Sequence, residues 1–172
     1  MAKATRDMSS GLPAQVLADI QQGTLGYHYK GVPCLKNPFD LCLYMKLIYE
    51  LQPRTILEIG SAAGGSAIWF ADMQQNYGIE GEVVSIDLKR VRGVEHPRVR
   101  FLQGDATSLQ GTLDQEFLSS LPRPWLVIED AAHTYDVTMA VLNFFLAQLR
   151  VGEYIIVEDG IVNDLPGEVY AA

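Results

Sequence analysis

The chain has 172 residues, 48% of them hydrophobic and 20% charged, which is typical of one globular domain with a proper core. Its formal net charge of −8 argues against nucleic acid or an anionic membrane as a partner, because both require a basic surface. Two cysteines, Cys34 and Cys42, are too few for a disulfide framework, and we interpret them as buried thiols. With no signal-peptide core and no membrane-length apolar run, the sequence predicts a cytoplasmic protein.

The hydrophobic pattern predicts strands that alternate with helices. Short apolar runs between turn signals indicate buried parallel strands, and helical periodicity indicates the helices that cover them. The expected helices span residues 13–22, 38–51, 66–77, 109–121 and 134–150, and residues 26–37 form a loop. The first expected strand contains Ile56, Leu57 and Ile59, and the others span residues 83–87, 98–103, 125–128 and 154–157. The prediction is an α/β fold with a Rossmann-like, doubly wound parallel sheet.

This connectivity predicts the strand order 3-2-1-4-5, with residues 154–157 at one edge. That strand is aromatic and β-branched and contains no proline, so it favours pairing with another strand. We expect either chain beyond residue 172 or a homo-oligomer to cover it. Within the helix 38–51, four apolar residues recur at every fourth position and predict a core-facing stripe: Phe39, Leu43, Leu47 and Leu51.

A glycine-rich segment, TILEIGSAAGGS over residues 55–66, joins the first strand to the following helix. Gly60 allows a sharp turn, and we expect Gly64 and Gly65 to let the backbone pass close to a ligand at a helix N-terminus. Glu58 precedes Gly60 by two residues, and the spacing of the glycines differs from the dinucleotide motif G-x-G-x-x-G. The segment resembles the nucleotide loop of class I S-adenosylmethionine (SAM) methyltransferases. An ordinary strand–turn–helix junction is the alternative.

Acidic residues follow every predicted strand, where ligands bind in parallel sheets. They are Glu58, Asp87, Asp105, Asp130, Glu158 and Asp159. At the end of the second strand, Asp87 is suited to accept hydrogen bonds from both ribose hydroxyls of a nucleoside. Asp105, which precedes Ala106, either contacts an adenine amino group or caps the next helix.

The tips of the fourth and fifth strands predict a metal site. Asp130, Glu158 and Asp159 would converge there, and mutually repelling carboxylates favour a bound cation such as Mg²⁺, Mn²⁺ or Ca²⁺. Three residues after Asp130, His133 lies near the start of a helix, where it would serve as a general base. The alternatives are a helix cap at Asp130, a polar turn at residues 158–159 and a surface histidine. We expect Glu129 to face elsewhere.

Six short motifs in order resemble the cephalosporin hydroxylase-like/rhamnosyl O-methyltransferase family. They are KNPFD (36–40), EIG (58–60), GGSA (64–67), SID (85–87), DAAHTY (130–135) and VED (157–159). The similarity covers roughly residues 24–164. This family is related to metal-dependent macrolide sugar O-methyltransferases and, more distantly, to catechol O-methyltransferase.

The resemblance implies a SAM-dependent, metal-dependent O-methyltransferase acting on a hydroxyl of a small molecule, a sugar or natural-product acceptor, with Mg²⁺ or Mn²⁺. The implied cofactor-binding residues are Glu58, Gly60, Ser61, Gly64, Ser66, Asp87, Asp105 and Ala106. The implied metal ligands are Asp130, Glu158 and Asp159, with His133 as the catalytic base. Ala132 stands where many members carry a second acid. Residues 1–37 would form an N-terminal segment with a substrate-side loop, and residues 38–172 the SAM-binding core.

Two other functions stay open. A non-catalytic SAM-binding protein would keep Glu58, Gly60 and Asp87 without a working metal site. A non-haem iron oxygenase requires two histidines and a carboxylate. The three histidines are His28, His96 and His133, and none belongs to a His-x-acid pair.

Overall fold

The structure, a computed structural model, describes residues 11–159. A parallel sheet of five strands lies at its centre, in the order β5-β4-β3-β6-β7. The strands are β3 (Thr55–Ile59), β4 (Glu82–Asp87), β5 (Val99–Gln103), β6 (Trp125–Glu129) and β7 (Tyr154–Val157). Their order and parallel pairing confirm the predicted doubly wound sheet, with β7 at one edge.

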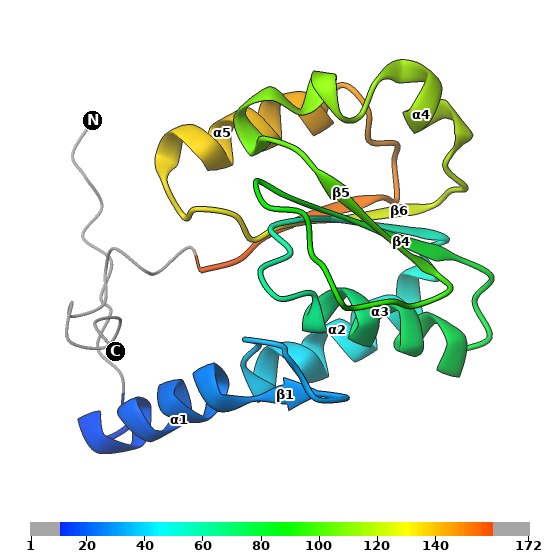
Figure 1. Cartoon of the computed structure of the whole chain (residues 1–172). Helices are drawn as coiled ribbons and strands as arrows, with labels where there is room; N and C mark the ends of the chain where they lie inside the picture. Colours follow the sequence, from blue (N-terminus) through cyan, green and yellow to red (C-terminus); the bar gives the residue numbers. More distant parts are fainter. Residues whose placement is uncertain (1–10, 160–172) are drawn as a thin grey trace.

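Helices cover both faces of the sheet (Figure 1). The helices α2 (Pro38–Leu51) and α3 (Gly65–Asn76) cover one face. The opposite face carries the 3₁₀ helix η1 (Ala106–Gly111) and the helices α4 (Gln115–Ser120) and α5 (Tyr135–Leu146). The N-terminal helix α1 (Ala14–Gly26) projects away from the sheet in Figure 1. No helix within residues 11–159 is long and apolar enough to cross a membrane.

A small hairpin connects α1 to α2. Its strands are β1 (His28–Tyr29) and β2 (Val32–Pro33), which pair antiparallel and pack against α3. The short linker after β2 then brings Lys36 and the helix cap Asn37 to the start of α2. The hairpin therefore places a segment from the N-terminal region directly against the sheet domain.

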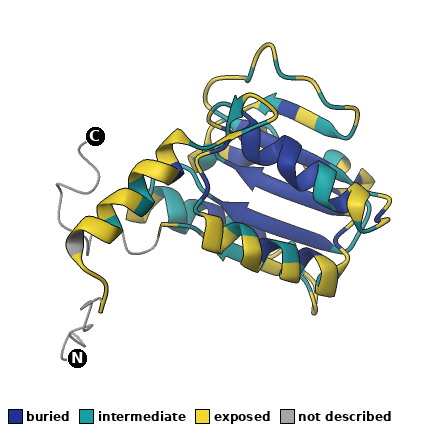
Figure 2. Cartoon of the chain, turned by 90° about the horizontal axis from the view of Figure 1, so that it is seen from below, coloured by how far each residue is buried: buried dark blue, intermediate teal, exposed yellow. Residues whose placement is uncertain are grey.

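The strands divide their side chains between two core layers, because successive residues of a strand face opposite sides. Ile56 and Ile128 belong to the layer under α2 and α3, whereas Leu57, Ile59 and Val127 belong to the layer under α5. Figure 2 shows the central strands of the sheet and much of α3 as buried, and much of α1 and α2 as exposed. A residue two positions beyond Ile56 or Ile128 therefore faces the α3 side.

The predicted core stripe of α2 is wrong at the first two of its four positions. Phe39 and Leu43 are 67% and 66% exposed, whereas Tyr44 and Ile48 are buried. The ring of Tyr44 packs edge-on against Phe70 of α3, with 5.0 Å between ring centroids. The leucine spacing indicates that a stripe exists, but the packing of the aromatic residue against α3 decides which side of the helix turns inward.

Four further expectations differ from the structure. The single helix expected at 109–121 is divided into η1 and α4, because the Asp114 side chain accepts a hydrogen bond from the Phe117 N–H and starts a new helix. The helix α1 continues past Gly23, and α5 ends at Leu146. Of the two cysteines, Cys34 is buried and Cys42 is exposed.

Candidate cofactor and metal site

The glycine loop brings the tips of β3 and β6 together. Gly60 has a φ of +110°, and a Cβ atom there would lie 2.0 Å from the backbone oxygen of Asp130. Gly64 and Gly65 serve contacts within the protein. A Cβ atom at Gly64 would meet Phe101, and one at Gly65 would lie 2.2 Å from the Pro33 carbonyl oxygen. Close packing against β5 and the hairpin therefore requires glycine at both positions, and their approach to a ligand stays a prediction.

Asp87 holds the glycine loop against the end of β4. Its Oδ2 accepts hydrogen bonds from the backbone N–H groups of Ser61 and Ala62, both at 3.0 Å. Its Oδ1 accepts a third bond, from Lys89 N–H at 3.1 Å. A carboxylate has about four acceptor positions, so Asp87 keeps capacity for a ligand hydroxyl.

A cavity of about 240 Å³ opens beside Asp87. Its lining includes the apolar side chains Leu88, Ala106 and Val137 together with the carboxylates of Asp87, Asp105 and Asp130. Apolar walls with a few converging polar groups are usual for a nucleoside site. Of the residues that the sequence predicts as cofactor-binding, this cavity is lined by Gly60, Asp87, Asp105 and Ala106.

Glu58 is not among the residues that line this cavity. Two positions after Ile56, it faces the α3 side of the sheet, where it is fully buried. It accepts a hydrogen bond from the Ser85 hydroxyl, which also bonds to the Ser61 hydroxyl at 2.6 Å. Burial raises the pKa of Glu58, whereas Lys36 and the hydroxyls of Ser66 and Ser85 oppose this shift. Glu58 thus supports the turn from the core side, together with Ser61 and Ser66 of the loop.

Asp105 fulfils one of the two roles that its sequence position left open. It caps η1 by accepting hydrogen bonds from the N–H and the hydroxyl of Thr107, at 2.8 and 2.7 Å. These bonds lower the pKa of Asp105. The helix-cap role is therefore confirmed, and the side chain lies at the cavity where an adenine contact remains open to it.

Three side chains at the tips of β6 and β7 form a cluster suited to a cation: Asp130, His133 and Asp159. One donor atom from each lies within 4.8 Å of the other two. The Nε2 of His133 is 3.4 Å from Asp159 Oδ2 and 4.0 Å from Asp130 Oδ1. His133 and Asp159 both have a positive φ, near +50°, so each sits at a tight turn. The donor set, two carboxylates and one imidazole, fits a divalent ion.

Glu158 is placed differently from the other predicted ligands. Its Oε1 accepts hydrogen bonds from Lys36 Nζ at 2.6 Å and from the Tyr44 hydroxyl at 2.5 Å. Lys36 Nζ also donates to Asp130 Oδ2. Glu129 faces α5 and accepts a bond from the Thr138 hydroxyl, so its expected exclusion from the site is confirmed.

Lys36 lies at the site, although the sequence analysis gave it no role of its own. Its side chain is 2% exposed, and burial by itself would lower the pKa of its ammonium group. The carboxylates of Asp130 and Glu158 reverse this effect, so the pKa of Lys36 is raised and the group is charged. Burial also raises the pKa of Asp130, against the opposing effect of Lys36. One sequence signal could have pointed to Lys36. It is a lysine directly before an Asn-Pro helix start, in a chain with many acids at strand ends.

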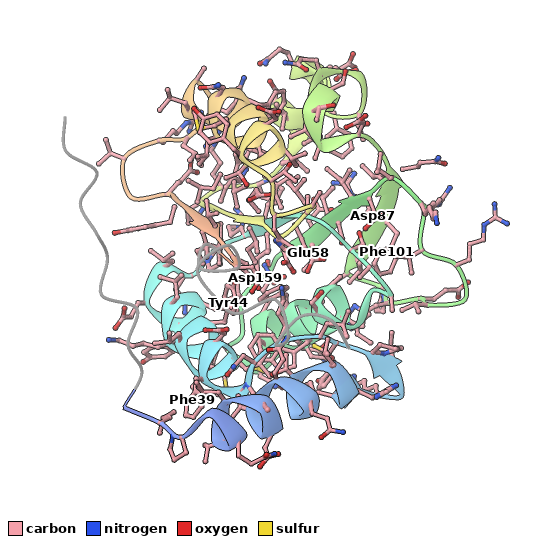
Figure 3. The ribbon with its side chains drawn as sticks, turned by 90° about the vertical axis from the view of Figure 1, so that its left-hand side faces the viewer. Phe39, Tyr44, Glu58, Asp87, Phe101 and Asp159 are labelled. Carbon is pink, nitrogen blue, oxygen red and sulfur yellow. The ribbon has the colours of Figure 1, made fainter. Side chains whose placement is uncertain are left out.

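A second cavity, of about 280 Å³, lies between α2 and β7. Four of its lining residues have acidic or hydroxyl side chains and four are apolar: Asp40, Tyr44, Glu158, Asp159, Leu43, Leu47, Ile156 and Val157. Figure 3 shows Tyr44 and Asp159 close together, with Asp87 on the other side of Glu58 in that view. Asp159 belongs to this second cavity and Asp130 to the first, so the cation cluster touches both.

Residues 21–172 match the family model described as Rhamnosyl O-methyltransferase/CmcI. The chain belongs to this family. Within it, the rhamnosyl O-methyltransferase of Mycobacterium tuberculosis is 28% identical over 143 residues, which cover 80% of this chain and 58% of that protein. The chain thus spans somewhat more than half the length of this curated relative.

Solved structures agree with the family assignment. A structure of CmcI with Mg and SAM has a TM-score of 0.69 and 28% identity, covering 98% of this chain and 75% of that one. The methyltransferase MycE from the mycinamycin biosynthetic pathway, in complex with Mg and SAH, has a TM-score of 0.54 and 20% identity. It covers 88% of this chain and 41% of its own, a likeness in fold. Both the predicted resemblance and the predicted methyltransferase fold are confirmed.

Proposed function

We propose that this chain forms the SAM-binding and metal-binding core of an O-methyltransferase that acts on a hydroxyl of a small molecule, a sugar or another natural product. One observation carries the proposal: the Asp130–His133–Asp159 cluster touches two separate cavities. A methyl donor beside Asp87 and a hydroxylated acceptor beside Asp159 would meet at this cluster. Methyl transfer requires that proximity, because the reacting atoms must approach in line.

Asp87 is the residue we propose for the ribose of the donor. Its Oδ1 and Oδ2 already fix the loop, and the remaining acceptor positions would bind ribose hydroxyls. The apolar side chains of Leu88, Ala106 and Val137 would enclose the adenine ring, with Asp105 near its amino group. The CmcI structures with SAM and with SAH support this choice of ligand for the family.

Asp130 and Asp159 are the residues we propose for holding Mg²⁺ or Mn²⁺, because hard divalent cations prefer carboxylate oxygens. When bound, such an ion would lower the pKa of an acceptor hydroxyl, so that the hydroxyl would lose its proton more readily at neutral pH. The assignment of Glu158 as a third ligand stays a prediction. In the described structure its Oε1 accepts hydrogen bonds from Lys36 and Tyr44. Ala132 lines the first cavity, and its methyl side chain has no atom that could bind a metal ion.

His133 is our proposed general base. Its Nε2 would accept the proton of the acceptor hydroxyl, and Asp159 Oδ2 at 3.4 Å would stabilise the resulting imidazolium. The acceptor would enter by the cavity along α2. Asp40 and Asp159 there suit hydroxyl groups, whereas Leu43, Leu47 and Ile156 suit a less polar body.

The oxygenase alternative finds no support among residues 11–159. His28 Nδ1 lies 2.8 Å from the Gly26 carbonyl oxygen, and His96 pairs with Asp72, so neither belongs to the cation cluster.

A cytoplasmic location and a homo-oligomer that covers β7 are part of the proposal, and light scattering tests the latter. We also propose the division into residues 1–37 and 38–172. Lys36 belongs to the first segment, but its side chain reaches the site in the second.

Calorimetry with S-adenosylhomocysteine, with and without Mg²⁺, tests the proposal on the 172-residue chain. We expect saturable one-site binding and, with SAM and a panel of hydroxylated sugars, metal-dependent methyl transfer detected by mass spectrometry. Binding without any metal-dependent transfer would favour the non-catalytic SAM-binding protein. Absence of binding at millimolar ligand in a folded sample would overturn both.

A further inference from the structure

Asp72 of α3 meets two segments that lie apart from it in the sequence. Its Oδ2 accepts hydrogen bonds from the Tyr29 hydroxyl at 2.8 Å and from Lys30 Nζ at 2.6 Å, both in the hairpin. Its Oδ1 lies 3.5 Å from Nε2 of His96. His96 belongs to the β4–β5 loop, which spans residues 88–98. The two oxygens of one carboxylate thus join the hairpin and the β4–β5 loop to the same helix.

The charge state of these groups suits their bonds. The side chains of Asp72 and His96 are 14% and 11% exposed, so water competes weakly for them. Burial alone would raise the pKa of Asp72, but the bonds from Lys30 and Tyr29 lower it overall, so the carboxylate is charged at neutral pH. Burial and the bond to Asp72 raise the pKa of Tyr29 to about 12, which keeps its hydroxyl a donor. On His96, Nδ1 accepts the Arg98 N–H at 3.2 Å, so the ring proton lies on Nε2, facing Asp72.

The local sequence explains how the hairpin reaches Asp72. Lys30 and Gly31 have positive φ angles of 50° and 81°, as the two-residue turn of a tight hairpin requires. This turn brings Tyr29 and Lys30 to the same carboxylate. Along α3, Asp72 follows Gly65 by about two helical turns, so both lie on the face that packs against the hairpin (Figure 1).

The same two segments also cover the glycine loop. A Cβ atom at Gly65 would lie 2.2 Å from the Pro33 carbonyl oxygen, which belongs to the hairpin. A Cβ atom at Gly64 would lie 3.1 Å from Cγ1 of Val91, which belongs to the β4–β5 loop. That loop begins with Leu88, which lines the first cavity. Each segment therefore contacts the glycine loop at one point and the α3 carboxylate at another.

We propose that Asp72 is a positioning residue for the methyl donor: it clamps the hairpin and the β4–β5 loop onto α3, and the clamped segments fix the glycine loop and Leu88 from outside. The effect on the donor rests on the proposed function, whereas the clamp itself does not. Without the clamp the two segments would sample more conformations, which the donor would have to order when it binds. Donor affinity should therefore fall, although Asp72 lines neither cavity.

The first test is calorimetry with S-adenosylhomocysteine, at a temperature where circular dichroism shows each variant folded. Asp72→Ala should weaken binding at least about fivefold. The matched control Glu95→Ala removes an exposed acid next to His96 and should keep the affinity within about twofold. In the methyl-transfer assay, Asp72→Ala should raise KM for SAM and leave kcat within about twofold, because the cation cluster is not touched. A lower Tm with unchanged affinity and KM would show a purely structural acid and overturn the proposal.

Two conservative variants test the clamp from each segment. Tyr29→Phe removes one hydroxyl, whereas His96→Asn keeps an acceptor for the Arg98 N–H but is too short to reach Asp72. Each should weaken S-adenosylhomocysteine binding by about threefold in the natural chain and have almost no effect once Asp72 is replaced by alanine. Equal effects in both backgrounds would overturn the clamp. If Asp72→Ala does not fold, the natural background decides, and unchanged affinity in either variant refutes the inference.

Hydrogen exchange separates this inference from the proposed function, because it requires no ligand. The amides of residues 61–66 and 88–96 should exchange faster in Asp72→Ala, or in His96→Asn if that variant does not fold, than in the natural chain and in Glu95→Ala. If the natural chain does not bind S-adenosylhomocysteine, the proposed function fails and hydrogen exchange alone decides the clamp. Equal exchange rates would overturn it.

Discussion

The two ends of the site are built by different means. At the donor end, the Asp87 carboxylate bonds to backbone N–H groups of Ser61 and Ala62, 26 and 25 residues away. At the metal end, the side chains of Lys36 and Tyr44 bond to carboxylates 94 to 122 residues away. The first end is assembled within one strand–helix–strand unit, and the second requires the whole described fold.

This difference has an energetic consequence. Backbone amides remain in place when a side chain changes, so a substitution at the donor end should mainly weaken ligand binding. At the metal end, loss of one partner of a buried ion pair leaves the other charge unpaired, which typically costs about 3–5 kcal/mol. Substitutions there should reveal whether a residue serves the fold or the chemistry, as we propose for Asp159 and His133.

The largest effect on activity is expected for Asp159→Asn. Its side chain is 45% exposed, so the fold should persist, while loss of a metal ligand removes several kcal/mol of charge stabilisation. Methyl transfer should fall by about 1000-fold, and the rise in Tm caused by Mg²⁺ should disappear. Asp136→Asn, at an exposed acid in the first turn of α5, is the matched control and should keep both properties. An Asp159→Asn protein that Mg²⁺ still stabilises would remove Asp159 from the metal site.

A smaller loss is expected for His133→Asn. Asparagine tolerates the positive φ at this position, so the turn should be kept. Loss of a general base should lower methyl transfer by about 100-fold or more, whereas affinity for S-adenosylhomocysteine should not change. Mg²⁺ affinity is the second readout: a parallel loss would show that His133 acts as a ligand and not as the base.

At the donor end, Asp87→Ala should weaken S-adenosylhomocysteine binding by roughly 1.5–3 kcal/mol, the loss typical of hydrogen bonds to a charged group. The response of Tm to Mg²⁺ should be retained, because Asp87 lies outside the cation cluster. Calorimetry measures both. Unchanged affinity would contradict the ribose assignment, and a lost metal response would show that the two ends are not independent.

The smallest effect is expected for Asp105→Asn. The asparagine oxygen can still accept the Thr107 bonds that cap η1, so the local structure should hold. Affinity for S-adenosylhomocysteine should fall by less than about fivefold, since the side chain is exposed to solvent. A loss as large as that of Asp87→Ala would give Asp105 a principal role in cofactor binding.

The sequence by itself determined the strand order, the edge position of β7 and the place of Asp87 and Asp130 at strand ends. These features follow from local signals, because apolar runs, glycine turns and the connection rules of parallel sheets act over short stretches of chain. The family motifs added the identity of the residues at the strand tips. The turn at Gly60 also lies where the local pattern predicts it.

Only the tertiary structure decided which side of α2 is buried, that Glu58 supports the loop from inside, and that Glu158 bonds to Lys36 and Tyr44. The physical reason is that each of these depends on the rotation of an element about its axis and on partners far apart in sequence. A buried charge needs an opposite charge nearby, but the sequence does not specify which one. For Lys36 that choice is made where the hairpin, α2 and the tips of β6 and β7 meet.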